Sequence, residues 1–380
     1  MYFVGKLKCS KSKFDLREGY TTGACAAAAA RAAVRGLLER KLTQNITIQI
    51  PNREWVNFKL ERIEIDDVVL VGVLKDAGDD PDCTHGLEIQ CIAKLSHVKG
   101  VHLKGGRGVA VVTKPGLELP VGSPAINPIP HSNIIEMAKL EWVNASIDLQ
   151  DRFGLELTIV VPNGEQVAKE TINERLGLLG GISILGTRGT VKPYSTSAFA
   201  ASVRQSIQIA ASNSLDTVLL TTGSRSEKAA KALFPEKDEM SLIQAGDFIG
   251  VGLRAAKRYQ LKKITLVTMI GKMSKLISGR MMTHVSGHGI DFNQLSQLAF
   301  EEGIAYQVCR EISSANTGRH ALNLVSKHNP HRFFNRLCAE TQKHALNYVK
   351  FGLEIDVILI DFDGSPLGHS LQSIQMEAAG

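Results

Sequence analysis

The chain has 380 residues, of which 44% are hydrophobic and 22% are charged, and this composition excludes an intrinsically disordered protein. The net charge of +6, with 6% aromatic residues and no Lys/Arg block, does not reach a nucleic-acid-binding signature but permits an acidic ligand. At this length two domains are expected.

Targeting and redox features point to one compartment. No apolar run approaches the roughly 18 residues that a membrane helix needs, and the N-terminus lacks the long apolar region of a secretory signal. The six cysteines are scattered without C-x-x-C spacing, which argues against a zinc site and a disulfide framework. We therefore expect a soluble cytoplasmic protein with no membrane partner, no nucleic-acid partner and no metal site.

The stretch Gly19 to Gly36 reads GYTTGACAAAAARAAVRG and predicts a helix with eight alanines among the ten residues from Ala24 to Ala33. Alanine is the best helix former, and Thr21 or Thr22 supplies an N-cap oxygen. The alanine face favours close packing on a sheet. Alternatively, free N–H groups at the helix start hold an anion.

The rest of the first half predicts an α+β domain. Short strand-like runs, connected by segments rich in Gly, Pro, Asp and Asn, predict an antiparallel or mixed sheet. The expected strands are NITIQI, WVNFKLERIEI, DVVLVGVLK, LEIQCIAKL, GVAVVTK and LELTIVV. Two helices are also expected, over SNIIEMAKLEW and EQVAKETINERLG.

In the second half, apolar runs alternate with helical patterns, which predicts a parallel sheet covered on both faces. The runs are DTVLLTT, KITLVTM, IAYQVC and IDVILID, and the helical patterns include SRSEKAAKALF and LSQLAFEEG. We place the boundary so that an α+β domain spans 1–200 and an α/β three-layer domain spans 201–380. Ligands of such sheets bind beyond the carboxyl ends of the strands, which points to 222–225, 271–272 and the loop after Asp361.

The loop DAGDDPDCTHG, from Asp76 to Gly86, carries four aspartates and a histidine in eleven residues. Held together, these carboxylates would bind a cation, orient a cationic cosubstrate or share a proton. A solvated acidic turn between strands is the alternative.

Glycine-rich turns offer backbone amides to an anion. The segment GGISILGTRGT, from Gly180 to Thr190, has four glycines, with Arg188 adding charge, and a domain hinge is its alternative role. Around Gly271 the sequence MIGKMSKLISG is no phosphate loop, because Lys272 is followed by Met273 and the upstream glycine is absent. What remains is a helix start with Lys272 and Lys275 close together, which suits a carboxylate.

Several motifs taken together resemble one family, the cobalt-precorrin-5B C1-methyltransferases of anaerobic cobalamin biosynthesis. They occur in the family's order between Leu16 and His284, and the final strand IDVILIDFDG fits as well. The departures are Ala24 and Arg188, where threonine is expected, and His131, where arginine is usual. The matching stretches are LREGYTTGACAAAAARAA, DAGDDPDCTHG, GGRGVAVVTKPGL, PAINPIP, TINERLGLLGGISILGTRGTV, AGDFIGVGL and GKMSKLISGRMMTH.

The resemblance implies transfer of a methyl group from S-adenosylmethionine to C1 of cobalt-precorrin-5B, giving cobalt-precorrin-6A. Cobalt then enters only as part of the corrinoid substrate. The resemblance also implies an α+β first domain, similar to the second domain of ribosomal protein S5, and an α/β second domain. The glycine signature of the commonest methyltransferase class is absent, as this fold implies.

Roles are assigned to residues as hypotheses. The acidic loop is assigned to catalysis, to meet the cationic cosubstrate or assist a proton loss, through Asp79, Asp80, Asp82 and His85. Cosubstrate contacts are assigned to Thr222, Gly223, Asp247 and Gly271. The carboxylate arms of the macrocycle are assigned to Thr21, Thr22, Gly23, Arg188, Lys272 and Lys275.

Two other classes stay open, a small-molecule phosphate-handling enzyme and a non-catalytic tetrapyrrole carrier. The missing phosphate loop argues against the first, and the second needs no cosubstrate. A homo-oligomer is also possible, but nothing in the sequence specifies one.

Overall fold

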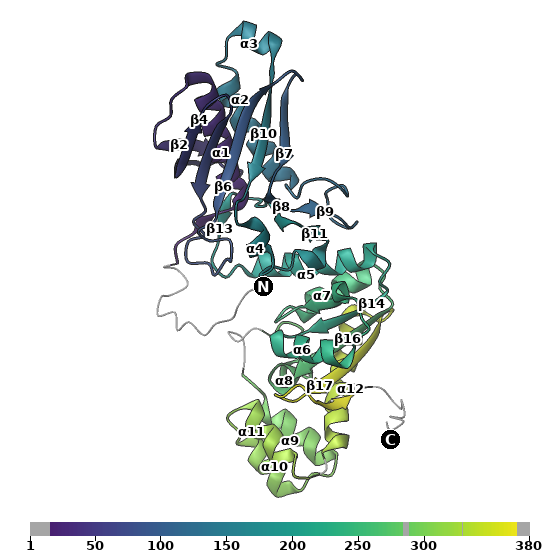
Figure 1. Ribbon diagram of the computed structural model, residues 1–380. Helices are drawn as coiled ribbons and strands as arrows, with labels where there is room; N and C mark the ends of the chain where they lie inside the picture. The colour runs from purple at the N-terminus through teal and green to yellow at the C-terminus, as the bar shows by residue number, and fades with distance from the viewer. Residues whose placement is uncertain (1–15, 284–288, 329, 371–380) are drawn as a thin grey trace. The chain divides into compact units, whose positions relative to one another are not determined.

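The computed structural model describes residues 16–283, 289–328 and 330–370 (Figure 1). The chain forms two compact units, Met1–Ser195 and Thr196–Gly380. The sequence placed the boundary after residue 200. The units divide five residues earlier because helix α5 (Thr196–Ser212) begins there, and its Val203 and Ile207 belong to the core of the second unit.

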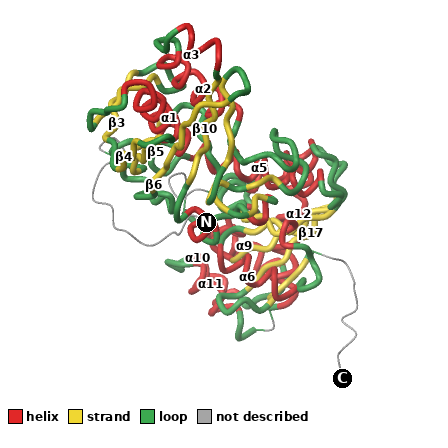
Figure 2. Tube along the Cα trace, turned by 45° about the horizontal axis from the view of Figure 1, so that its top comes forward, coloured by secondary structure: helices red, strands yellow, loops and turns green. Residues whose placement is uncertain are grey.

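The first unit is built on a five-stranded sheet in the order β4-β5-β6-β10-β7, in which only β10 and β7 are parallel. Helices α1 and α2 lie side by side on one face of this sheet (Figures 1 and 2). The expected α+β mixture and mixed sheet are confirmed. The elements are β1 (Gly19–Tyr20), α1 (Thr22–Glu39), β2 (Asn45–Gln49), β3 (Trp55–Lys59), β4 (Arg62–Ile65), β5 (Val69–Leu74), β6 (Glu88–Ser96), β7 (Val101–Gly105), β8 (Gly108–Val109), β9 (Val111–Val112), α2 (Pro128–Trp142), α3 (Ile147–Arg152), β10 (Gly154–Val160), α4 (Gly164–Ala168), a 3₁₀ turn (Glu174–Leu176), β11 (Leu178–Leu179), β12 (Gly181–Ile182) and β13 (Thr190–Val191).

The alanine helix α1 is buried over nearly its whole circumference. Ala26 to Ala30 have no exposed surface, because α1 packs against β5 and β6 on one side and against α2 on the other. The Thr21 side chain accepts a hydrogen bond from the Ala24 N–H and caps the helix, as predicted. The packing role expected of the alanines is confirmed.

A charged cluster joins the outer edges of α1 and α2. The Glu141 carboxylate accepts hydrogen bonds from Arg31 Nε at 2.6 Å and from Arg35 Nη2 at 2.8 Å. The Glu141 side chain is only 7% exposed. Although burial alone would raise its pKa, the two guanidinium groups lower the pKa of Glu141 below its usual range.

The second unit has a sheet in the order β15-β14-β16-β17-β18, parallel except for β18 at one edge. Helix α6 covers one face, and α5, α7, α8 and α12 cover the other, so the expected sheet covered on both faces is confirmed. After α5, the elements are β14 (Thr217–Thr221), α6 (Ser224–Leu233), a 3₁₀ turn (Glu239–Ser241), β15 (Leu242–Gln244), α7 (Ile249–Arg258), β16 (Lys263–Met269), α8 (Ile270–Leu276), α9 (Phe292–Glu301), α10 (Tyr306–Ser313), α11 (Gly318–Val325), α12 (His331–Val349), β17 (Glu354–Ile360) and β18 (Pro366–His369).

Two element predictions were wrong. The run IAYQVC lies at the start of α10, because Val308, Cys309 and Ile312 recur at helical spacing and are the residues that this helix buries. The helix expected over EQVAKETINERLG ends at Ala168, and a turn and a short 3₁₀ segment follow. Strands β7 and β15 were not predicted.

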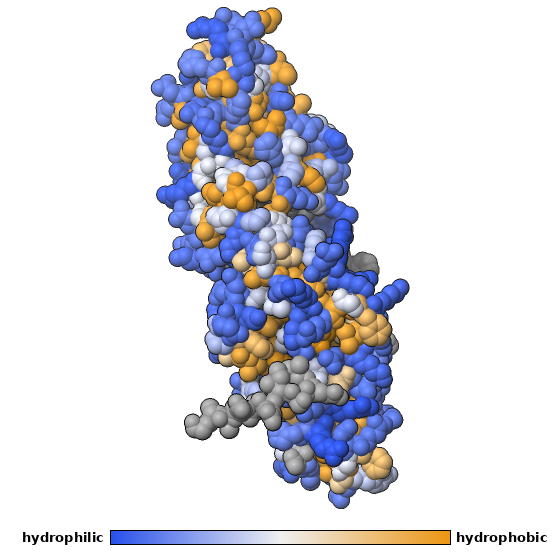
Figure 3. All heavy atoms as spheres, turned by 90° about the vertical axis from the view of Figure 1, so that its right-hand side faces the viewer, coloured by the Kyte–Doolittle hydropathy of each residue, from blue (hydrophilic) through white to orange (hydrophobic). Residues whose placement is uncertain are grey.

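Surface and thiol features complete the description. No helix in the described part of the chain is long and apolar enough to cross a membrane. Hydrophobic side chains lie in patches among hydrophilic ones on the face shown in Figure 3. Among the described residues, the cysteines are free thiols, and Cys9 lies outside them.

Candidate functional site

The parallel sheet of the second unit has one topological switch point. From β14 the chain passes to β15 on one side of it, and then to β16 and β17 on the other side. Ligands of open α/β sheets bind outside the carboxyl ends of the strands at such a point. The segments that follow β14 and β16 therefore mark the candidate site.

A hydroxyl network fixes the segment after β14. The Thr222 hydroxyl donates to the Thr268 hydroxyl of β16 at 3.1 Å, and the Thr222 N–H donates to Ser226 Oγ at 2.9 Å. Ser226 Oγ in turn donates to the Gly223 carbonyl at 2.8 Å. Since Thr222, Thr268 and Ser226 are all buried, these bonds hold the backbone at Gly223 in one conformation.

One lysine joins the ends of three strands. Lys272, in α8, donates to the Thr222 carbonyl at 2.6 Å, and its ammonium lies 3.1 Å from Asp247 Oδ1. The Asp247 carboxylate also accepts from the Thr283 hydroxyl at 2.8 Å, and Lys275 donates to the Thr283 carbonyl at 2.9 Å. The structure therefore brings together Thr222, Asp247, Lys272 and Lys275, which were identified in separate motifs.

Two glycines of this site face open space. A Cβ atom built on Gly223 or Gly271 would meet no heavy atom within 4 Å. A ligand can approach the main chain closely at both positions, beside the switch point. The main chain at these two glycines is therefore accessible to a ligand at the carboxyl edge of the sheet.

Two residues at the start of α11, Gly318 and Arg319, also lie at this edge of the sheet and were not predicted. The guanidinium of Arg319, in α11, lies over the Phe362 ring at 4.4 Å, in the loop after β17. The neighbouring Gly318 lies close to the amide of Gly271. The sequence indicated the loop after Asp361, but it gave no signal that α11 would return to this place.

The acidic loop of the first unit is held by partners within that unit. Arg17 forms a bidentate pair with Asp76, and Asp79 accepts from the Arg17 N–H at 2.9 Å. Asp82 accepts from the buried Lys75 ammonium at 2.6 Å. Burial acts to raise the pKa of Asp82, but the Lys75 charge and hydrogen bonds lower it overall. Asp76 and Asp79 therefore anchor Arg17, which lies shortly before α1, and Asp82 balances the charge of Lys75 at the end of β5.

Asp80 and His85 differ from the other members of this loop. Asp80 is buried and accepts from the Tyr194 N–H at 2.9 Å, and burial raises the pKa of its carboxyl. His85 Nδ1 accepts from the Ala77 N–H at 3.0 Å, so the ring proton lies on Nε2. Although His85 Nδ1 lies 3.8 Å from Asp76, this tautomer makes no ion pair there. The pKa of the Asp80 carboxyl is thus raised, whereas the pKa values of Asp76 and Asp82 are lowered.

The start of α1 does not offer the free amides that the anion hypothesis needs. The Gly23 N–H donates to the Leu185 carbonyl at 3.0 Å, and the Ala24 N–H donates to the Thr21 hydroxyl at 3.2 Å. The Thr22 hydroxyl accepts from the Leu185 N–H at 2.9 Å. The expectation that free N–H groups at the start of this helix hold an anion is therefore corrected, because the Gly23 and Ala24 N–H groups already donate to Leu185 and Thr21.

The same contacts fix the glycine loop that carries Arg188. The Thr21 N–H donates to the Gly189 carbonyl at 3.0 Å, and a Cβ on Gly186 would lie 2.4 Å from the Thr21 side chain. Gly186 has φ +134°, which favours glycine. The Arg188 side chain itself is exposed. Thr21, Thr22 and Gly23 thus position this loop.

Among the residues that the structure describes, no group of three or more His, Cys, Asp or Glu side chains is placed to hold a metal ion.

Comparison with known proteins covers both units. A family model described as CbiD matches residues 9–193, and one described as CbiD, C-terminal domain, matches residues 282–371. The chain is 45% identical to the cobalt-precorrin-5B C(1)-methyltransferase of Leptospira borgpetersenii serovar Hardjo-bovis, over 93% of this chain and 95% of that protein. It is 44% identical to the protein of the same name from Priestia megaterium, over 95% and 98%.

The chain thus belongs to a class of methyltransferases of cobalamin biosynthesis. Its family is that of the cobalt-precorrin-5B C(1)-methyltransferases, as the motifs predicted. A crystal structure of a cobalamin biosynthesis protein (cbiD) from Archaeoglobus fulgidus is also similar, with 26% identity, a TM-score of 0.38, and coverage of 76% of this chain and 85% of that one.

Proposed function

We propose that this protein transfers a methyl group from S-adenosylmethionine to C1 of cobalt-precorrin-5B, giving cobalt-precorrin-6A. The observation that carries this proposal is identity of 44–45% to the curated methyltransferases over at least 93% of the chain, which includes both units. The cobalt belongs to the substrate. The reaction is an in-line displacement in which the ring carbon supplies the electron pair for the new C–C bond, the S–CH3 bond breaks, and S-adenosylhomocysteine leaves as a neutral thioether.

We place the cosubstrate at the switch point of the second unit. Thr222, Gly223, Asp247 and Gly271 would hold it, since the two glycines leave the main chain open and the two polar residues are fixed by their neighbours. When bound, S-adenosylmethionine supplies an electrophilic methyl group. The contribution of these residues is alignment, which accounts for much of the rate in a displacement of this kind.

The role of Lys272 changes in this proposal. Its ammonium is already balanced by Asp247 and bound to the Thr222 carbonyl, so it shapes the cosubstrate site and does not receive a substrate carboxylate. Lys275 is similarly engaged with the Thr283 carbonyl. Arg188 is exposed and remains our candidate for a carboxylate arm of the macrocycle, on a loop that Thr21, Thr22 and Gly23 position.

For the acidic loop, we propose that Asp80 is the member with a chemical role. Asp76, Asp79 and Asp82 accept hydrogen bonds from Arg17 or Lys75, whereas the Asp80 carboxyl is buried with a raised pKa. A carboxyl whose pKa is raised by burial is a stronger base than an exposed carboxylate, which suits the proton loss assigned to this loop. Asp79, Asp82 and His85 then hold the loop in place.

The direct test is mass spectrometry of a corrinoid intermediate incubated with the protein and S-adenosylmethionine labelled in its methyl group. We expect the corrinoid to gain one labelled methyl. No gain, with a folded protein, would reject the proposal. Calorimetry separates the alternatives, because a tetrapyrrole carrier would bind neither S-adenosylmethionine nor ATP, and a phosphate-handling enzyme would bind ATP.

Three finer statements are also proposals. We propose that the first unit is similar to the second domain of ribosomal protein S5, on the strength of the α+β arrangement and the family. We propose that the protein works in the cytoplasm, where its substrate would be made. Among ligands, we propose a small-molecule corrinoid and no nucleic acid.

A further inference from the structure

Two opposite charges flank the Phe362 ring at the carboxyl edge of the parallel sheet. The Arg319 guanidinium lies 4.4 Å from the centre of this ring. The Asp361 carboxylate, which directly precedes Phe362 in the chain, accepts a hydrogen bond from the Phe362 N–H at 2.7 Å. Among the residues that the structure describes, no acidic group pairs with Arg319 and no basic group pairs with Asp361. Both charges are therefore available to a ligand.

Neighbouring charges at this edge are already occupied. Lys272 pairs with Asp247, and their nearest charged atoms lie 3.1 Å apart. The Asp363 carboxylate, two residues after Asp361, accepts from the Ser365 N–H at 2.9 Å and from the Ser365 hydroxyl at 2.7 Å, which closes the turn after β17. The unpaired charges of Asp361 and Arg319 are thus not explained by the packing of the turn.

The start of α11 is held against the start of α8, and this contact fixes the position of Arg319. A Cβ atom on Gly318 would lie 3.0 Å from Ile270 Cγ2 and 3.5 Å from the Gly271 nitrogen, so the two segments touch. The Thr317 side chain caps α11 at its first turn. Arg319 is therefore placed beside the open main chain at Gly271.

The order of the strands sets the reach that a ligand of this edge needs. Strand β17 pairs with β16, and β16 pairs with β14. The loop at Phe362 thus stands two strand spacings, about 10 Å, from the open main chain at Gly223. An elongated ligand can contact Gly223 and Gly271 with one end and the Phe362 loop with the other.

The two charges suit an α-amino acid, which carries an ammonium and a carboxylate on one carbon atom. A receptor for it needs an anion and a cation that lie close together but do not neutralise each other. Asp361 and Arg319 meet this condition, because they flank one ring without forming an ion pair. A guanidinium that lies over an aromatic ring keeps its N–H edge for a bidentate carboxylate, and a carboxylate accepts from an ammonium.

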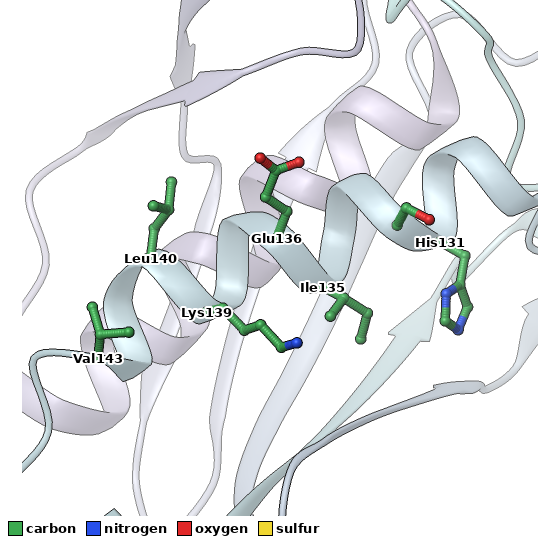
Figure 4. Close-up of a pocket in the computed structure, with 7 residues that line it drawn as sticks. His131, Ile135, Glu136, Lys139, Leu140 and Val143 are labelled. Atoms are coloured by element: carbon green, nitrogen blue, oxygen red, sulfur yellow. The ribbon is translucent and has the colours of Figure 1, made fainter.

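The hollow along the outward face of α2, of about 450 Å³, does not offer this arrangement (Figure 4). Its lining is largely aliphatic, through Ile135, Leu140 and Val143. Its two charged side chains, Glu136 and Lys139, point to opposite sides of the helix, so they do not converge on one ligand. The charges at Phe362 are therefore the better candidate for recognition of a zwitterion.

We propose that Arg319 binds the carboxylate and Asp361 the ammonium of the amino-acid part of S-adenosylmethionine, while the nucleoside part lies toward Gly223 and Gly271. This assignment rests on the proposed function, and it adds the residues that recognise the amino-acid end of the cosubstrate. It also gives a reason for selectivity against ATP, which carries no ammonium for Asp361.

The test is isothermal calorimetry with two thioethers that differ only in the amino-acid part, S-adenosylhomocysteine and 5′-methylthioadenosine. We expect the wild type to bind S-adenosylhomocysteine at least about tenfold more tightly. Arg319→Gln and Asp361→Asn should each weaken S-adenosylhomocysteine at least about tenfold, because one charged hydrogen-bond partner is lost. Both variants should bind 5′-methylthioadenosine as the wild type does.

Decarboxylated S-adenosylmethionine separates the two roles, because it keeps the ammonium and lacks the carboxylate. Asp361→Asn should weaken its binding, whereas Arg319→Gln should not. The matched controls are Arg258→Gln, at another arginine over an aromatic ring but at the end of α7, and Asp363→Asn, within the same turn. Both controls should leave the three affinities unchanged, and thermal melting establishes that every variant is folded.

The outcomes distinguish this assignment from the proposed function. If the wild type binds S-adenosylhomocysteine and both variants bind it equally well, Arg319 and Asp361 do not recognise the amino acid, and the proposed function stands. An equal loss of 5′-methylthioadenosine binding would also overturn the assignment, because the residues would then act on the nucleoside or on the fold. If the wild type binds neither S-adenosylmethionine nor S-adenosylhomocysteine, the proposed function fails and the assignment fails with it.

Discussion

The ammonium of Lys272 lies 3.1 Å from the Asp247 carboxylate at the carboxyl edge of the parallel sheet. Lys272 follows β16 and Asp247 follows β15, and the same ammonium donates to the Thr222 carbonyl after β14. One side chain thus holds three strand ends together beside the switch point. The charge of the pair is balanced, so this edge of the sheet is polar without being strongly charged.

Loss of this lysine should impair cosubstrate binding more than folding. For Lys272→Ala we expect S-adenosylmethionine to bind about tenfold more weakly, because Asp247 and the Thr222 carbonyl lose their shared donor. Isothermal calorimetry measures the affinity. The control is Lys262→Ala, which removes an exposed pair with Asp216 at the other end of the same strands. Equal affinities for both variants would show that the cosubstrate does not lie at this edge.

The open space at Gly223 gives a second, independent probe. Gly223 has φ 162°, which is extended backbone, and an added Cβ meets nothing within 4 Å. Gly223→Ala should therefore change the free energy of unfolding by less than about 1 kcal/mol. If the cosubstrate lies against this backbone, the added methyl group weakens its binding at least tenfold. Unchanged binding with unchanged stability would place the ligand elsewhere.

The acidic loop allows chemical and structural roles to be distinguished. Asp80→Asn should bind S-adenosylmethionine normally but turn over slowly, since the amide cannot exchange a proton. Asp82→Asn should instead lower the free energy of unfolding by about 3 kcal/mol, because the buried Lys75 ammonium loses its carboxylate. Turnover assays and urea denaturation measure the two effects. Wild-type turnover by Asp80→Asn would end the proposed role of this residue.

Acid should weaken the contact between α1 and α2. Because Arg31 and Arg35 lower the pKa of Glu141 below its ordinary value of 4.5, the carboxylate stabilises the fold above that pH. The contribution is lost as the pH falls through the lower pKa of the folded state. We expect wild type to unfold at a higher temperature than Glu141→Gln at neutral pH, and the two melting temperatures to converge in acid. Parallel curves would contradict this assignment.

Local chemistry explains what the sequence predicted well. The Thr21 cap and the burial of the alanines follow from short-range rules, and the predicted strands placed residues 222–225 and 271–272 at strand ends, where they lie. The rules failed where a pattern is short. IAYQVC reads as a strand until Ile312 shows the helical spacing, and β15 has only three residues.

The sequence could not predict which residues pair with one another through side-chain contacts. Nothing in the motif around Lys272 shows that its ammonium is taken up by Asp247, which lies 25 positions earlier. The contacts between the Thr22 hydroxyl and Leu185 span 163 positions, so the occupied helix start could not be foreseen. The same limit applies to Arg319, which reaches Phe362 only because α11 folds back on the sheet.

The alanines of α1 let this helix approach both the sheet and the neighbouring helix α2 to within the size of a methyl group. A larger side chain at any position from Ala26 to Ala30 would push α1 away from the sheet or from α2, and a shift between the two helices would part Glu141 from its arginines. Tolerance to substitution should therefore be lowest along the alanine run of α1, although these side chains carry no functional group. In a library of random variants selected for folded protein, we expect substitutions by larger residues to be depleted first in this stretch, whereas charged surface positions continue to vary.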